Sequence, residues 1–329
     1  MNLVTGATGH IGNVLVRELL AQKQPVRVMV LPNDNCQSIE GLNVEKVEGN
    51  VLKPEMLDRA LEGVDTVYHL AGIISIVPGA ETLMRKVNVD GARNTAQAAL
   101  KAGVKRMVHI SSIHAFRRMP HGVCIDETIP FAPDNPAGAY DRTKAEGTLA
   151  VLETVDQGLD AVVACPTGVI GPYDYLDSEM GNVILNFARK KLHFLVRGAY
   201  DFVDVRDVAK GLTQAADKGR TGEAYILSGA RIEIPQIKQI VQDFVGIHTP
   251  QIVVPMWLAE LFASLTESFY RVTHAIPKFT HYSLRTVQEN CDFSNAKARV
   301  ELGYNPRPLR ETIADILSWR RSPTWAWMG

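Results

Sequence analysis

The stretch LVTGATGHIG, residues 3–12, decides the fold of this 329-residue chain. It places Gly6, Gly9 and Gly12 between a short apolar segment and an amphipathic pattern over residues 11–22. Residues without a Cβ permit tight turns, and a helix that begins there directs free N–H groups at a phosphate. The order strand, loop, helix predicts a dinucleotide-binding turn, although the spacing is not G-x-G-x-x-G. The alternative is an ordinary glycine-rich turn.

Outward from this loop, short apolar runs alternate with helical patterns. The runs read VRVMV, TVYHLA, RMVHISS and AVVACP, and helical patterns fall near 54–62, 82–102 and around Tyr140. Unbroken apolar runs are typical of strands buried on both faces, so the chain is expected to form an α/β fold with a Rossmann-type, doubly wound parallel sheet. We expect a dinucleotide-binding domain over 1–165, to which 200–230 returns through YILSG (225–229), and a smaller, mostly helical substrate lobe over 166–199 and 231–329.

Composition excludes several classes of protein. A net charge of −1 without a long basic run argues against a nucleic-acid partner. Four scattered cysteines give no metal-ligand spacing and no disulfide framework, as in a reducing compartment. The apolar stretch IVVPMWLAELFASL is interrupted by Pro255 and Glu260, so no membrane span is expected. The chain starts with a strand-like segment and not a signal peptide, so a cytoplasmic protein is predicted.

The segment AYDRTKAEG (139–147) sets Tyr140 and Lys144 four residues apart, on one face of a helix. Such a pair arises often by chance, so neighbouring groups must decide its meaning. Ser111 and Ser112 end the strand RMVHISS, at the edge of the sheet where open α/β folds bind ligands. A carbonyl that receives hydride develops negative charge on oxygen, which must be protonated or held by donors. A serine, a tyrosine and a lysine that lowers the phenol pKa would meet that need.

With these residues together, the sequence resembles the extended short-chain dehydrogenase/reductases, the NAD-dependent epimerase/dehydratase superfamily. The resemblance rests on T-G-x-x-G-x-x-G (Thr5–Gly12), Ser112 and Y-x-x-x-K. It extends over nearly the whole chain through YHLAG (68–72), NVDGARN (88–94), CPTGVIGP (165–172), FVDVRDVA (202–209) and DFSNAKARVELGYNP (292–306). Each piece is weak alone, but their shared order is specific.

The resemblance implies an NAD(P)(H)-dependent enzyme without a metal. Tyr140 would be the general acid/base, Lys144 would hold the nicotinamide ribose and lower the tyrosine pKa, and Ser112 would position the substrate oxygen, with Ser111 as the alternative. An Asp that usually contacts adenine is replaced by Asn50. The residues expected to contact the cofactor are Gly6, Thr8, Gly9, His10, Ile11, Gly12, Asn50, Val51, Leu70, Ala71, Gly72, Asn88, Tyr140, Lys144, Pro166 and Val169.

The choice between NAD and NADP stays open. An acidic residue at the end of the second strand would bind the ribose 2′-hydroxyl, and an Arg there would accept a 2′-phosphate. The sequence VRVMVLPND has Leu31 and Pro32 at that point. Asn33 and Asp34 lie slightly late, where they either reach the ribose or are solvated loop residues.

The branch of the family is indicated by smaller differences. Dehydratases of this family have an acidic residue after the catalytic Ser or Thr, where this chain has Ile113, and UDP-sugar epimerases tend to have an Asn where it has Thr167. CPTGVIGP resembles dihydroflavonol 4-reductases, and HISSIHAF (109–116) resembles these and 3β-hydroxysteroid dehydrogenases. We therefore expect interconversion of a secondary alcohol and a ketone on a hydrophobic small molecule.

Two other functions are compatible with parts of this sequence. The first is a nucleotide-sugar epimerase with tightly bound NAD, in which Arg231 and Arg285 would clamp a diphosphate. The second is a non-catalytic dinucleotide sensor, against which the Ser112, Tyr140 and Lys144 set argues.

Several further residues have competing interpretations. His114 and Thr167 are candidate substrate contacts, Arg117 and Arg118 a solvated pair, His69 and His109 core residues, and DRTKAE the polar side of its helix. MWLAELFASLTESFY (256–270) would be a core helix or a lid over an apolar substrate. By family analogy, the helices near 82–102 and 140–156 would form a homodimer interface.

Overall fold

The computed structural model describes residues 1–74, 79–261 and 281–321. Seven strands form its central sheet: β1 (Asn2–Thr5), β2 (Val26–Val30), β3 (Glu45–Glu48), β4 (Thr66–His69), β5 (Arg106–Ile110), β6 (Ala161–Pro166) and β10 (Ala224–Leu227). Their order is β10-β6-β5-β4-β1-β2-β3, and every neighbouring pair is parallel. The predicted doubly wound parallel sheet is therefore confirmed.

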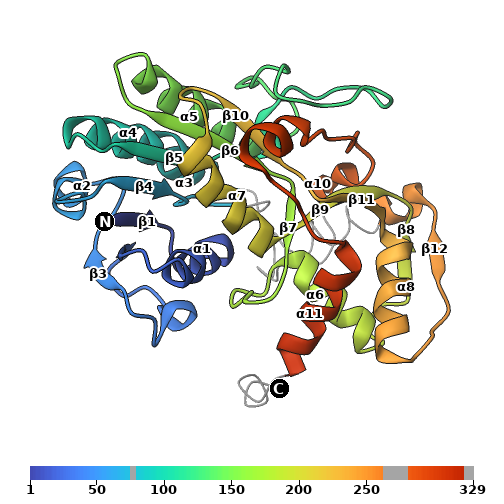
Figure 1. Cartoon of the computed structure of the whole chain (residues 1–329). Helices are drawn as coiled ribbons and strands as arrows, with labels where there is room; N and C mark the ends of the chain where they lie inside the picture. Colours follow the sequence, from blue (N-terminus) through green and yellow to red (C-terminus); the bar gives the residue numbers. More distant parts are fainter. Residues whose placement is uncertain (75–78, 262–280, 322–329) are drawn as a thin grey trace.

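Helices cover both faces of this sheet (Figure 1). One layer contains α1 (His10–Ala21) and α7 (Val205–Lys218), which pack against each other. The other contains α2 (Pro54–Ala60), α3 (Glu81–Arg85), a π-helical turn η2 (Lys86–Asp90), α4 (Gly91–Lys101) and α5 (Ala139–Val155). A Cβ on Gly147 of α5 would lie 2.1 Å from the carbonyl oxygen of Asn88 in η2, so only glycine permits this approach.

The strand order reverses between β1 and β4, which creates a switch point at the carboxyl edge of the sheet. The glycine loop follows β1, the segment 70–74 follows β4, and Ser111 and Ser112 follow β5. Because carboxyl ends of parallel strands meet at one edge, these three segments lie together there.

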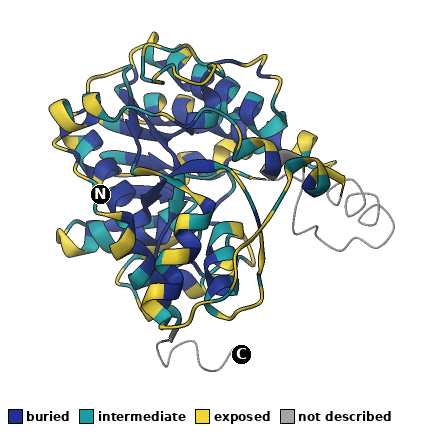
Figure 2. Ribbon diagram, turned by 90° about the vertical axis from the view of Figure 1, so that its right-hand side faces the viewer, coloured by how far each residue is buried: buried dark blue, intermediate teal, exposed yellow. Residues whose placement is uncertain are grey.

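The strands at the centre of the sheet are buried on both faces. Every residue of β1 and of β6 is buried, which explains why their sequences show no polar alternation. Figure 2 shows the buried residues concentrated along the central sheet, with exposed residues on the outer surfaces of helices and loops.

A smaller lobe lies beside the carboxyl edge of the sheet (Figure 1). Besides helices it contains two small sheets with the strand orders β11-β9-β7 and β12-β8. Of their strands, the sequence pattern indicates only β9, through the strand-like run FVDV (202–205). Its strands are β7 (Gly168–Ile170), β8 (Phe194–Val196), β9 (Ala199–Asp204), β11 (Ala230–Glu233) and β12 (Ile252–Val254). Its helical elements are α6 (Glu179–Ala188), α8 (Ile234–Val245), α10 (His281–Thr286), η4 (Ala298–Leu302) and α11 (Leu309–Arg321).

The segment 200–230 is divided between the two sheets. β10 pairs with β6 in the large sheet, whereas β9 pairs with β7 and β11 in the small one. Of the stretch MWLAELFASLTESFY, residues 262–270 lie outside the described part of the chain, so its role as a lid stays a prediction.

Candidate active site

The glycine loop has the geometry of a phosphate cradle. Gly6 has φ of +68°, and a Cβ there would lie 2.8 Å from the main-chain nitrogen of Ala71. A Cβ on Gly12 would lie 2.1 Å from the carbonyl oxygen of Gly6. Helix α1 begins after Gly9, and no side chain caps it. The main-chain N–H groups of its first turn are therefore available to an anion, and the loop fits a dinucleotide pyrophosphate.

One side of the loop is bordered by the segment that follows β2. The Thr8 hydroxyl donates a hydrogen bond of 2.9 Å to Asp34, and the Ser38 hydroxyl donates one of 2.9 Å to the carbonyl oxygen of Thr8. Asp34 thus lies against the glycine loop, while Leu31, at the end of β2, is 51% exposed.

Four of the expected cofactor contacts have side chains that are engaged within the protein. The ring of His10 is hydrogen-bonded to the carbonyl oxygen of Pro172 at 3.0 Å, and burial lowers its pKa. Ile11 packs against the main core, Val51 is buried, and Asn50 accepts a hydrogen bond of 2.9 Å from the N–H of Leu52.

The segment after β4 is held in place from both sides. The Thr5 hydroxyl oxygen accepts hydrogen bonds from the N–H groups of Leu70 and Ala71, each at 3.2 Å. Asn88 accepts a hydrogen bond of 2.8 Å from the N–H of Ile73 and donates one of 3.1 Å to Thr143 of α5. Asn88 therefore connects this segment to α5, and Gly72, between the two anchored points, is exposed.

Ser112 and Tyr140 are brought together by β5 and α5. The Ser112 hydroxyl lies close enough to the Tyr140 phenol to lower its pKa, and it accepts a 3.2 Å hydrogen bond from the N–H of His114. Ser111 instead forms a 2.6 Å hydrogen bond with Thr148, in the buried interior. Of the two serines considered from sequence, Ser112 is therefore the one that contacts the tyrosine.

Burial dominates the protonation of the tyrosine. Desolvation raises the pKa of Tyr140 to about 12, the neighbouring Ser112 hydroxyl opposes this shift, and Asp141 reinforces it. The ammonium of Lys144 donates a 2.6 Å hydrogen bond to the carbonyl oxygen of Ile110, and burial lowers its pKa to about 8. The structure therefore shows the phenol with a raised pKa, where the resemblance implied one lowered by Lys144.

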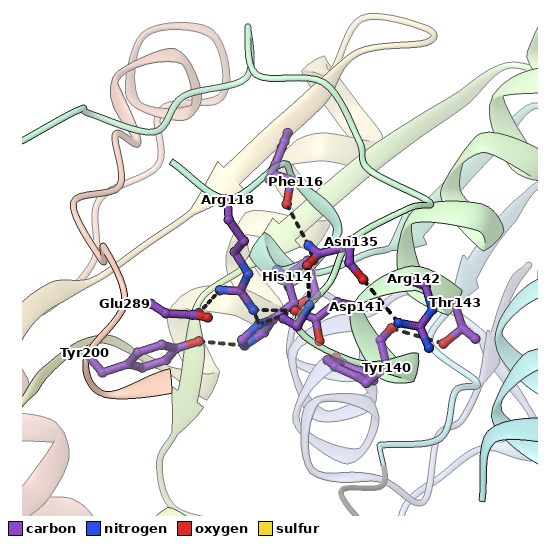
Figure 3. A network of polar contacts seen from close by, with 12 residues as sticks. His114, Phe116, Arg118, Asn135, Tyr140, Asp141, Arg142, Thr143, Tyr200 and Glu289 are labelled. Carbon is purple, nitrogen blue, oxygen red and sulfur yellow. Dashed lines mark hydrogen bonds and ion pairs between the residues drawn. The ribbon is translucent and has the colours of Figure 1, made fainter. Parts of the chain in front are cut away.

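A polar network adjoins Tyr140 (Figure 3). Nδ1 of His114 lies 3.2 Å from Asp141, and its Nε2 lies 2.8 Å from the hydroxyl of Tyr200. Arg118 forms ion pairs with both Asp141 and Glu289. The His114 and Tyr140 rings meet edge-on, with centroids 5.8 Å apart.

The network corrects two expectations from sequence. Arg118 was expected to be solvated with Arg117, yet only Arg117 is exposed. The DRTKAE segment was expected to be the polar side of its helix, yet Asp141 has no exposed surface. A charged residue is assigned to the surface by default, and its partners here come from segments distant in sequence. A cavity lies beside Arg118 and Glu289, lined also by Ile113, Phe116, Ile125 and Phe293.

The segment CPTGVIGP spans the end of β6 and the strand β7. The Thr167 hydroxyl donates a 2.6 Å hydrogen bond to the buried Asp201, so its side chain is occupied within the protein. Pro166 is the last residue of β6 and Val169 lies in β7, partly buried. Arg231 and Arg285, considered for a diphosphate clamp, are both exposed.

The two strand histidines are buried as expected. The rings of His69 and His109 stack with centroids 5.5 Å apart, and burial lowers the pKa of both. All four cysteines are free, and only Cys165 and Cys291 are buried. Within the described ranges, no group of side chains could hold a metal ion, and no helix is long and apolar enough to cross a membrane.

Comparison with known proteins places this arrangement in a family. Residues 2–228 match the sequence model of the NAD dependent epimerase/dehydratase family. The chain belongs to this family. It is therefore related to enzymes that use NAD, and the resemblance to extended short-chain dehydrogenase/reductases is confirmed.

The chain is similar over nearly its whole length to individual proteins of known sequence or structure. The chain is 36% identical to sterol demethylase protein B of Methylococcus capsulatus, with 97% of this chain and 98% of that protein aligned. It is 30% identical to a putative dihydroflavonol 4-reductase of Synechocystis, over 96% of this chain and 93% of that protein. The crystal structure of gox2253 superposes with a TM-score of 0.85 at 32% identity, covering 98% of each chain.

Proposed function

We propose that this protein is an NAD(P)(H)-dependent oxidoreductase that interconverts a secondary alcohol and a ketone on a hydrophobic small molecule. In this proposal Tyr140 exchanges the proton with the substrate oxygen, and Ser112 donates a second hydrogen bond to it. The bound dinucleotide would supply or accept the hydride.

The meeting of Ser112 and Tyr140 at the carboxyl edge of β5 carries the proposal, because the Ser112 hydroxyl is close enough to lower the pKa of the tyrosine. Two hydroxyl groups are thereby available to one substrate oxygen. A phenol with a pKa of about 12 is protonated at neutral pH, so Tyr140 is suited to donate a proton to the oxygen that becomes negative during reduction. Lys144 stands one turn further along α5, where its ammonium would hold the nicotinamide ribose.

Other residues would hold the rest of the cofactor. The main chain of the loop from Gly6 to Gly12 would bind the pyrophosphate. The backbone at Ala71 and Gly72 would line the nicotinamide side, because Thr5 and Asn88 fix that segment on both sides.

A hydrophobic ketone or alcohol is favoured as substrate by two observations. Relatives at 30% identity or more include proteins named for sterol demethylation and for dihydroflavonol reduction. Ile113 follows Ser112, so the site has no acidic residue there for dehydration chemistry. His114 and Tyr200, whose rings stack 6.2 Å apart beside Tyr140, would contact the substrate.

A nucleotide-sugar epimerase is the second candidate, because the family includes epimerases. It requires the same Tyr140 but also a site for a diphosphate, for which Arg231 and Arg285 are the candidates. The two functions are separated by whether cofactor is consumed.

The deciding experiment follows nicotinamide absorbance when the protein meets NADH or NADPH and a panel of hydrophobic ketones. Steady consumption that Tyr140→Phe abolishes would support the oxidoreductase. Tyr225→Phe is the matched control, because it removes a buried hydroxyl that bonds Glu301 away from the site. No consumption with any ketone, together with protein that is purified with NAD bound and acts on UDP-sugars, would favour the epimerase.

We also propose that the protein is a homodimer. The expected interface consists of α4 and α5, which pack side by side on one face of the sheet. Light scattering after size-exclusion chromatography would measure the mass, and a mass of 36.2 kDa would contradict the proposal.

A further inference from the structure

A cluster of cations lies at the C-terminal end of α6, at one edge of the small lobe. Arg189, Lys190 and Lys191 follow directly after α6, and all three are exposed. Among the residues that the structure describes, none of the three has a carboxylate within ion-pair distance. Their charges are therefore presented to solvent.

Exposed apolar side chains lie on the strand pair that follows these cations in the chain. Phe194 and Ile252 begin the paired strands β8 and β12 and are partners in the parallel ladder. Neighbouring partners in a ladder point to the same face, and here Phe194 is 59% and Ile252 is 48% exposed. Ile247, just beyond the end of α8, is 38% exposed. The N–H of Ile252 donates a 3.2 Å hydrogen bond to the carbonyl oxygen of His193, which holds this part of the edge together.

Negative charge is absent from both segments that form this edge. The sequence has no Asp or Glu from 180 to 200 or from 244 to 259, although the whole chain has slightly more acidic than basic residues. The nearby carboxylate of Asp243 pairs with His248 and Arg310. The edge therefore combines unpaired positive charge with exposed aromatic and aliphatic groups.

We propose that this edge, which consists of Arg189, Lys190, Lys191, Phe194, Ile247 and Ile252, docks on the surface of an anionic lipid bilayer. The cations would meet the headgroup charges, while the apolar side chains would enter the boundary between headgroups and acyl chains. A nucleic acid would use the cations but leave Ile247 and Ile252 in water. An edge that has both cationic and apolar side chains therefore fits a bilayer better than a nucleic acid.

This docking is independent of the proposed chemistry. The edge contains none of the residues expected to bind cofactor or substrate, so its loss would leave a correct catalytic assignment intact. If the oxidoreductase function also holds, docking would bring the protein to the phase in which a hydrophobic substrate dissolves.

The test is co-sedimentation of the full chain with vesicles of phosphatidylcholine alone or mixed with phosphatidylglycerol. We expect binding to the anionic vesicles only, weakened by salt because the attraction is screened. Lys190→Glu combined with Lys191→Glu should lower the apparent affinity by at least about tenfold. Phe194→Ser should also lower the apparent affinity for anionic vesicles, and the size of this decrease should not depend on the salt concentration.

Two control variants match these changes elsewhere on the surface. Lys46→Glu alters an exposed cation of β3, and Val300→Ser removes an apolar side chain that is 85% exposed in η4. Both should bind vesicles as the parent does. The proposal is overturned if the parent protein does not bind anionic vesicles, or if all variants bind them equally. It is also overturned if the double variant of Lys190 and Lys191 loses binding to RNA but keeps binding to lipid. Unchanged circular dichroism would show that each variant is folded.

Discussion

Asp141 and Arg118 compete for the same nitrogen of His114. The Asp141 carboxylate lies 3.2 Å from Nδ1, and the Arg118 guanidinium lies 2.9 Å from it. A guanidinium can only donate, and a carboxylate can only accept. His114 therefore has two hydrogen-bonding states. When Nδ1 carries no hydrogen, it accepts a hydrogen bond from Arg118. When Nδ1 carries a hydrogen, it donates a hydrogen bond to Asp141. In either state its Nε2 is 2.8 Å from the hydroxyl of Tyr200.

The charge of Asp141 should be important for stability. Asp141→Ala removes a fully buried carboxylate that pairs with Arg118, and we expect a loss of about 3 kcal/mol in the free energy of unfolding. Glu146→Ala is the control on the same helix, because its partner Arg85 is 61% exposed and the pair should be worth about 1 kcal/mol or less. Urea denaturation measures both. Equal small losses would show that the buried ion pair between Asp141 and Arg118 contributes little to stability.

Ser112 and Ser111 should differ sharply in their effect on catalysis. Ser112→Ala removes the hydroxyl next to Tyr140, and we expect kcat to fall by about 10²–10³-fold, as for one lost donor to an oxyanion. Ser111→Ala removes only a buried hydrogen bond to Thr148, so it should lower stability more than kcat. The reverse outcome would move the catalytic role to Ser111.

The large domain was predictable because its signals are local. Each buried strand reads as one apolar run, and the glycine loop, Ser112 and the Tyr140–Lys144 spacing each lie within a few residues of sequence. Even β10, which returns after the lobe has begun, was indicated by the run YILSG.

The small sheets and the polar network were not predictable in this way. Strands β7, β8 and β12 have three residues each, too few for a periodic pattern, and Gly168 finds its partner at Phe202. The network joins His114, Asp141, Tyr200 and Glu289, which only the tertiary fold brings together. Nothing in the sequence around Asp141 distinguishes it from a solvated acid.

Cofactor affinity should depend on the protonation of Lys144. Burial lowers its pKa to about 8, so the ammonium is charged below this pH and neutral above it. If Lys144 holds the ribose, the Kd for NADH should rise by about fivefold to tenfold as the pH passes from 7 to 9. Fluorescence titration measures this constant, and Lys144→Met should give a weak, flat profile. A flat profile in the parent would argue against the role.

Asp201 should destabilise the fold at neutral pH. Burial raises its pKa from 3.8 to about 6, so its ionisation is harder in the folded chain than in the unfolded one. The cost grows as the pH rises between these values and reaches about 3 kcal/mol above them. Asp201→Asn keeps an acceptor for Thr167 and for the N–H of Gly229. It should therefore stabilise the protein at pH 7.5 and hardly at pH 4, as thermal unfolding would show. Destabilisation at both values would mean that the charge itself is needed.

The coenzyme should be NAD(H) and not NADP(H). Asp34 accepts a hydrogen bond from Thr8, which holds a carboxylate beside the glycine loop, where a ribose 2′-hydroxyl could donate to it and a 2′-phosphate would be repelled. Asp34→Ser should lower the ratio of kcat/KM for NADH over NADPH by about tenfold or more. Asn33→Gly is the neighbouring control and should leave the ratio unchanged, because Asn33 has φ of +62°, which glycine adopts without strain. A parent protein that prefers NADPH would show that Asp34 faces away from the ribose, and the side chains after β2 would then have to be searched for a phosphate contact.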